Sequence, residues 1–186
     1  MVKTSGQTEV YVNKMRVEQW LRAYCVPDKF CGYCKSCPDY NKRWSCPPGI
    51  PATKEYFDCY QEVYTIAVKV LYSKEDRLYS YNLEMAEKLR QATYGKVKRV
   101  LYETLLYIEK ENPGTLVLGA GRCEQCEVCS RIRGLPCQKP EKMRHSFAAF
   151  GFDFQKLVKD IVHQELLWSS SGLPEYNIAV AALLIH

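Results

Sequence analysis

The sequence predicts a mixed α+β (α/β) fold, in which a small three- to four-stranded sheet is covered by helices and carries two cysteine-rich metal-binding loops. Short runs of β-branched and apolar residues, typical of strands, alternate with segments whose apolar residues recur at helical spacing. Nine of the ten cysteines fall into two similar clusters, which predicts the loops. The 186 residues (1–186) fit one domain, and 47% apolar with 25% charged residues is an ordinary globular composition.

The N-terminal third is expected to form a helix, a cysteine loop and a short second helix. Apolar residues at helical spacing predict the first helix over 16–24, directly before Cys25: Val17, Trp20, Leu21 and Tyr24. The loop ends in the proline-rich run 46–51 (CPPGIP), which excludes both a helix and a central strand. Thr53 is expected to cap a short helix that runs through Tyr60.

The middle of the chain alternates strand and helix patterns. Residues 63–71 (VYTIAVKVL) are rich in β-branched residues and predict a buried strand, and 83–94 is expected to be helical. A second helix should end at Asn112-Pro113-Gly114, before a short strand over 115–118. One face of that helix is marked by Val97, Val100, Leu101, Thr104, Leu105 and Ile108.

The C-terminal part is expected to form a helix, a turn and a strand. Phe154, Leu157, Val158 and Ile161 predict an amphipathic helix with Asp153 as its N-cap. Residues 169–174 (SSSGLP) predict a turn, and 176–185 predict an apolar strand. We expect this strand at a sheet edge, where it could pair with a second copy of the chain to form a homodimer.

The cysteine spacing is the most specific signal in the chain. The first motif reads Cys31-x2-Cys34-x2-Cys37-x8-Cys46-Pro47, and the second reads Cys123-x2-Cys126-x2-Cys129-x7-Cys137. Two successive two-residue gaps let three thiolates converge, and a fourth follows after a short loop. Proteins wrap a [4Fe–4S] cluster in this way, so we expect an iron–sulfur cluster on each motif.

The first motif has more cysteines than a four-ligand site needs. Cys34, Cys37 and Cys46 belong to every candidate set, and the fourth ligand is either Cys31 or Cys25. A set with Cys25 would also suit zinc, which is therefore the alternative metal at this motif.

The second motif has four unambiguous positions. Zinc commonly uses two C-x2-C pairs that are well separated in sequence, whereas a third cysteine at the same gap favours a cluster. A long stretch of predicted sheet and helix separates the motifs, so each is expected to close its own site. Zinc remains the alternative here as well.

Basic and aromatic residues surround the cysteines, although the net charge of +5 does not itself favour nucleic acid. Cations near a cluster offset its negative charge, while the alternative is a solvated basic loop. Tyr40 and Trp44 could shield a cluster from water or serve as core anchors. The basic residues are Lys35, Lys42, Arg43, Arg122, Arg131, Arg133, Lys139, Lys142 and Arg144.

Four further residues are weaker candidates. Arg144 and Ser146 could contact a cluster sulfide or an anionic substrate, and the alternative is that they cap the following helix. His145 is more typical of a surface or hydrogen-bonded histidine than of a ligand or proton relay. Cys59, which stands alone in a predicted helix, is expected to be a buried structural thiol. No residue is assigned a catalytic role.

The sequence favours a cytoplasmic protein without a membrane segment. No apolar run approaches the ~20 residues of a membrane helix. The N-terminal segment lacks the hydrophobic core of a signal peptide, so the thiols are expected to stay reduced. Metal binding is therefore favoured over disulfides.

These motifs resemble the prokaryotic predicted metal-binding protein family, domain of unknown function 2284, over nearly the whole chain. The resemblance implies a cytosolic metalloprotein, often of anaerobes, in a family with no established activity. It also implies Cys25 rather than Cys31 as a ligand, so the additional Cys31 departs from the family pattern. The residues that carry it lie in 24–48 and 123–151: Tyr24, Cys25, Cys34, Cys37, Pro38, Tyr40, Trp44, Ser45, Cys46, Pro47, Pro48, Cys123, Cys126, Cys129, Gly134, Pro136, Cys137, Pro140, Arg144, Ser146 and Gly151.

We expect a protein that passes electrons between partner proteins and that docks an acidic redox partner on its basic residues. One rival is a redox enzyme or accessory factor whose cluster binds substrate, which a pocket beside Cys31 and Cys46 with inward-pointing Arg or Lys would favour. The other is a zinc-stabilised binding module, which zinc without acid-labile sulfide would favour.

Overall fold

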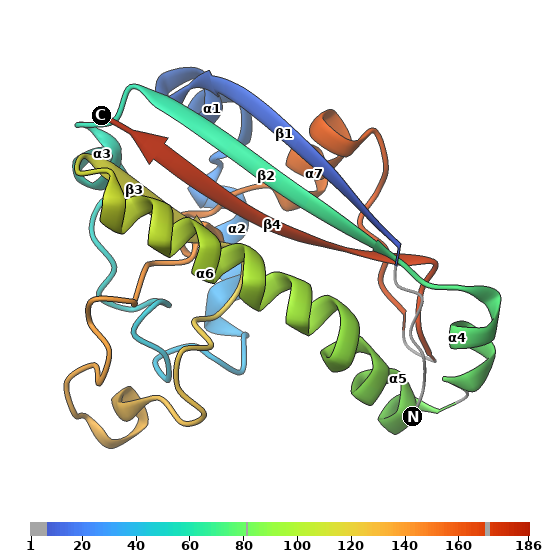
Figure 1. Cartoon of the computed structure of the whole chain (residues 1–186). Coiled ribbons are helices and arrows are strands. Elements are labelled where there is room, and N and C mark those ends of the chain that lie inside the picture. Colours follow the sequence, from blue (N-terminus) through green and yellow to red (C-terminus); the bar gives the residue numbers. More distant parts are fainter. Residues whose placement is uncertain (1–6, 81, 170–171) are drawn as a thin grey trace.

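The computed structural model describes residues 7–80, 82–169 and 172–186. It contains a four-stranded antiparallel sheet with helices on both faces, which confirms the predicted mixed α+β class (Figure 1). The strands lie in the order β1-β2-β4-β3 and are β1 (Thr8–Arg16), β2 (Glu62–Leu71), β3 (Thr115–Gly119) and β4 (Tyr176–Ile185).

β4 occupies an interior position, so the prediction of an edge strand is wrong. Ala182 pairs with Thr65 of β2 on one side and with Leu118 of β3 on the other. Its ten residues include no charged side chain, β2 pairs with it along its whole length, and β3 pairs with residues 181–185. The edges of the sheet are β1 and β3, and formation of a homodimer stays a prediction.

β1 is a strand that the sequence interpretation missed. Its residues alternate between exposed and half-buried along the whole strand, and Tyr11 pairs with Ala67 of β2. The inward positions include Glu9 and Asn13, which weakens the apolar alternation by which a strand is recognised.

One face of the sheet holds the larger part of the core. Trp20 is fully buried at its centre, with its ring 4.3 Å from that of Phe152 and 5.9 Å from that of Phe147. Asp153 accepts a hydrogen bond from the Lys156 N–H and caps the last helix, as predicted. The covering elements are α1 (Val17–Tyr24), α3 (Thr53–Phe57), the 3₁₀ turn η3 (Phe147–Phe150) and α7 (Phe154–Val162).

The opposite face is covered by one long helical segment. α6 (Lys96–Glu111) packs Leu105 against Val117 and Ala181 and ends before Pro113, as predicted. α5 (Leu83–Arg90) precedes it and is joined to it by a π-helical turn, η1 (Gln91–Gly95). α4 (Lys74–Tyr79), which was not predicted, begins at a capping box formed by Ser73 and Asp76.

Three local predictions need correction. The first cysteine segment is not a loop throughout, since it contains the helix α2 (Pro27–Lys35). Pro27 stands in the first turn of this helix, where proline is tolerated. α3 ends earlier than expected, and Ala52 rather than Thr53 stands at its N-cap. Cys59 was expected to be buried, but it is exposed in the turn after α3. The side chain from this segment that packs into the core is that of Phe57. The predicted turn over 169–174 lies partly outside the described residues.

No helix in the described part of the chain is both long and apolar enough to cross a membrane.

Candidate metal centre

The first cysteine motif packs against the backbone of η3. Val26, between α1 and α2, donates its N–H to the Gly151 carbonyl at 2.9 Å, so the start of α2 lies on the end of this turn. Three thiols then face three successive carbonyls: Cys25 Sγ to Phe150 O at 3.2 Å, Cys31 Sγ to Ala149 O at 3.8 Å and Cys34 Sγ to Ala148 O at 4.0 Å. The second half of the chain therefore forms the surface on which the first motif is arranged.

Gly151 makes this close approach feasible. It has a φ of +80°, and a Cβ built there would lie 2.5 Å from Pro27 Cα and 3.2 Å from Cys31 Sγ. Both the left-handed backbone and the lack of space require glycine. The glycine of the family pattern thus has a physical role beside the first motif.

Four thiols of the first motif lie near one another. Burial raises the pKa of Cys34, and its neighbours Cys31, Cys37 and Cys46 raise it further. Burial also raises the pKa of Cys25 to about 11, with Cys31 as the neighbouring thiol. The arrangement therefore groups Cys31 with Cys34, Cys37 and Cys46, and Cys25 is a fifth thiol beside Cys31.

The second motif gathers its own four thiols. Burial raises the pKa of Cys123, and Cys137, Cys126 and Cys129 raise it further. All four cysteines line one small cavity, together with Trp44 from the first motif. Each motif therefore brings its own cysteines together, and the closing of a separate metal site by each motif stays a prediction.

The loop of the second motif folds back on itself to return Cys137. The 3₁₀ turn η2 (Ser130–Arg133) follows Cys129 and ends at Gly134, which has a φ of +66°. The buried Ser130 Oγ then donates to the Pro136 carbonyl at 2.6 Å. This bond holds the turn that places Cys137 beside the other three cysteines.

One buried hydroxyl group connects the two motifs. Ser45 Oγ accepts the Cys123 N–H at 2.9 Å and lies 3.6 Å from Cys46 Sγ. The Ser45 side chain therefore touches a candidate ligand of each centre. Motifs that are far apart in sequence adjoin in the fold, and Figure 1 shows their segments on the same side of the molecule, below the α6–β3 layer.

Arg131 is the second connection between the motifs. Its Nη1 donates to the carbonyls of Arg43 at 2.8 Å and Cys46 at 2.7 Å, and its Nη2 donates to that of Pro48. The guanidinium lies 4.9 Å from the centre of the Trp44 ring, whose Nε1 donates to a carbonyl of the second motif. A charged side chain from the second motif thus satisfies three carbonyls of the first.

The donor set fits a group that takes soft sulfur ligands. Each motif offers at least four thiols, and thiolates hold both iron–sulfur clusters and zinc. Within the described ranges, no three His, Cys, Asp or Glu side chains are grouped so that they could hold a single metal ion. The thiols of each motif are therefore neighbours without forming a mononuclear site in this arrangement.

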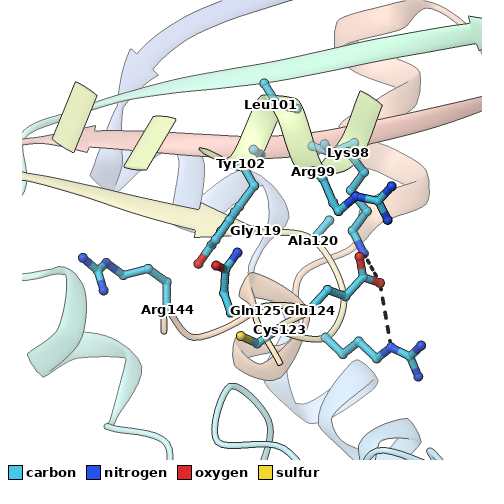
Figure 2. Close-up of a pocket in the computed structure, with 14 residues that line it drawn as sticks. Lys98, Arg99, Leu101, Tyr102, Gly119, Ala120, Cys123, Glu124, Gln125 and Arg144 are labelled. Carbon is cyan, nitrogen blue, oxygen red and sulfur yellow. Dashed lines mark hydrogen bonds and ion pairs between the residues drawn. The ribbon is translucent and has the colours of Figure 1, made fainter. Parts of the chain in front are cut away.

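A separate pocket lies against Cys123, between α6 and the segment that follows β3 (Figure 2). Glu124 Oε1 lies 3.1 Å from Lys98 Nζ and 3.8 Å from Arg122 Nε, and Figure 2 draws these two ion pairs as dashed lines. Two of the cations near the second motif are therefore held in ion pairs.

Arg144 and Ser146 have clear structural partners. Arg144 Nε donates to Glu109 Oε1 at 2.8 Å, and Glu109 Oε2 also accepts the Val117 N–H at 2.7 Å. The buried Ser146 Oγ accepts the Ala148 N–H at 3.2 Å and so caps η3, as the alternative interpretation expected. Arg144 pairs with α6 and does not cap a helix. Their contact with a bound cofactor stays a prediction.

His145 lies in an aromatic environment beside the core. It is half-buried between Tyr56 and Phe150, at ring distances of 5.5 and 6.2 Å. In the described part of the chain, its Nδ1 has no hydrogen-bond partner. Burial lowers the pKa of His145, and the charge of Arg131 lowers it further.

The sequence interpretation did not identify Ser45 or Glu109 as structurally important. Ser45 stands beside Cys46, but nothing in the spacing shows that its hydroxyl reaches the second motif. Glu109 lies on α6, where an acidic residue is ordinarily exposed.

The family model for predicted metal-binding proteins (DUF2284) matches residues 8–185 and therefore includes both motifs. The chain belongs to this family. Comparisons with curated proteins and with solved structures found no match. Membership of DUF2284 confirms the predicted family and a general metal-binding function, and the family description does not name the metal.

Proposed function

We propose that the protein carries two [4Fe–4S] clusters, one on each motif, and transfers electrons between partner proteins. The observation that carries this proposal is the direct contact of the two motifs through Ser45. Two adjoining centres would give an electron a path through the protein, which two isolated structural sites would not need.

The second centre would be held by Cys123, Cys126, Cys129 and Cys137. For the first centre, Cys34, Cys37 and Cys46 would be joined by Cys31, a neighbour of Cys34, or by Cys25, which the family resemblance implies. When bound, a cluster would supply one-electron chemistry.

Side chains beside the cysteines would surround a bound cluster with positive charge and shield it partly from water. Trp44 and Arg43 line the cavity of the second motif, as does Lys139. The aromatic ring would exclude water, and the cations would offset the charge of a thiolate-bound cluster, which raises its reduction potential.

The surface around the second motif suits an acidic redox partner. Val128, Ile132 and Leu135 are 57%, 55% and 49% exposed, and the basic residues Arg133 and Lys139 are exposed beside them. Apolar contacts rimmed by cations would fit a partner with acidic residues around an apolar centre. We place this activity in the reducing cytoplasm of a prokaryote.

Substituting single cysteines tests the proposal. Cys126→Ser should lose the iron and acid-labile sulfide of one centre and keep those of the other, because the four thiols of each motif serve separate sites. Visible and electron paramagnetic resonance spectra, with metal analysis, would measure this on protein purified without oxygen. Cys59→Ser is the matched control, since Cys59 is exposed and lies outside both motifs.

The proposal fails if Cys126→Ser keeps the full iron content of the unmodified protein. Stoichiometric zinc without sulfide in the unmodified protein would instead support the zinc-stabilised binding module.

A further inference from the structure

A groove of about 700 Å³ lies between the α5–α6 segment, β4 and the chain that follows α7. Its size falls within the ~300–1,000 Å³ range of small-molecule sites. It is distinct from the small cavity that holds the second-motif thiols, which shares no lining residue with it. Large apolar and aromatic side chains form its walls: Leu83, Tyr94, Phe154, Leu167, Trp168 and Ile178.

Two residues that line the groove adjoin the cysteine motifs, although no cysteine is part of its lining. Ala148, which lines it, has the carbonyl that faces Cys34 Sγ at 4.0 Å. Gly121, which also lines it, stands two residues before Cys123. Ala148 and Gly121 are both small, so a ligand in the groove could lie close to the backbone beside these two motifs.

The helical wall of the groove is irregular where it lines the cavity. η1 interrupts the α5–α6 segment with a π-helical turn, and Tyr94 of that turn lines the groove. π-Helical turns are rare and occur frequently at functional sites. The irregular turn is therefore part of the groove wall.

The charges at the groove favour an uncharged ligand. Arg90 forms an ion pair with Glu87, and both line the groove. Lys98, the other cation of the lining, is paired at 3.1 Å with Glu124. An anionic ligand would have to displace a carboxylate from one of these two cations. A neutral aromatic ligand could instead pack on the apolar and aromatic walls without breaking an ion pair.

We propose that this groove binds a neutral aromatic small molecule and holds it beside both cysteine motifs. The proposal concerns binding, and it does not depend on which metal the motifs hold. It goes beyond the proposed electron transfer between proteins, because it gives the protein a binding site for a small molecule near the two centres.

Equilibrium dialysis against N-phenyl-1-naphthylamine, a neutral aromatic compound, tests the proposal on the metal-loaded full chain. Dialysis measures bound compound directly and is unaffected by quenching from a metal centre. We expect about one molecule per chain with micromolar affinity, a typical outcome for an apolar site of this size. Leu83→Glu and Leu167→Glu each place a carboxylate at the apolar wall and should weaken binding about tenfold or more.

Val100→Glu is the matched control. Val100 is 53% exposed on α6 and lines a different groove, against β1 and β2, so the same change there should leave the affinity unaltered. Circular dichroism and metal content would establish that all three variants fold. The proposal is overturned if the unmodified protein does not bind the compound, or if Val100→Glu weakens binding while the other two variants do not.

Discussion

Gly151→Ala is expected to abolish the first metal centre. The added methyl group would lie 2.5 Å from Pro27 Cα, and the residue would have to keep a φ of +80°. The contact atom belongs to the backbone of α2, so it cannot turn away as a flexible side chain could. Overpacking and the left-handed backbone together should cost about 3 kcal/mol or more.

The expected result is a protein that has lost about half of its metal and unfolds at a lower temperature. α2 would have to move away from η3, and it carries Cys31 and Cys34. Gly134→Ala is the control: its φ is +66°, but nothing lies within 4 Å of the added Cβ. That variant should keep both centres and lose only about 1 kcal/mol. Equal metal loss in the two glycine variants would show that steric contact with α2 is unimportant.

Arg131→Met is expected to disturb the first centre, although Arg131 belongs to the second motif. The substitution keeps much of the apolar side chain but removes hydrogen bonds to three carbonyls of the first motif. Leaving these carbonyls without a charged donor should cost about 3 kcal/mol. We expect the first centre to lose metal at lower chelator concentrations, or on milder heating, than in the unmodified protein.

Spectra of Cys46→Ser and Cys137→Ser would assign each signal to its centre, so that loss from the first can be recognised. Arg133→Met removes an exposed arginine two residues further along the same loop and should change neither signal. If Arg131→Met and Arg133→Met behave alike, the two motifs are not coupled through Arg131.

The most regular parts of the fold were predictable because each helix has one apolar face and the two central strands are apolar along most of their length. α1 and α7 carry Trp20 and Leu157 at helical spacing, and β2 and β4 consist largely of β-branched and small apolar residues. β1 was missed because its inward side chains include polar residues. The interior place of β4 depends on pairing with both neighbours, which no local pattern encodes.

The two cysteine motifs were predictable from spacing, but their contact was not. Ser45 and Arg131 reach across to the other motif only because β3 and the segment after α1 bring both motifs together in the fold. Likewise, the requirement for glycine at position 151 comes from the approach of Pro27, which is distant in sequence. Such contacts depend on tertiary structure, and a single sequence carries no periodic signal for them.

Iron, zinc and acid-labile sulfide per chain, measured on protein purified without oxygen, test the central proposal most directly. Two [4Fe–4S] clusters predict about eight irons and about eight sulfides, with a broad visible absorption band. Stoichiometric zinc with no sulfide would contradict the proposal and make both motifs structural sites.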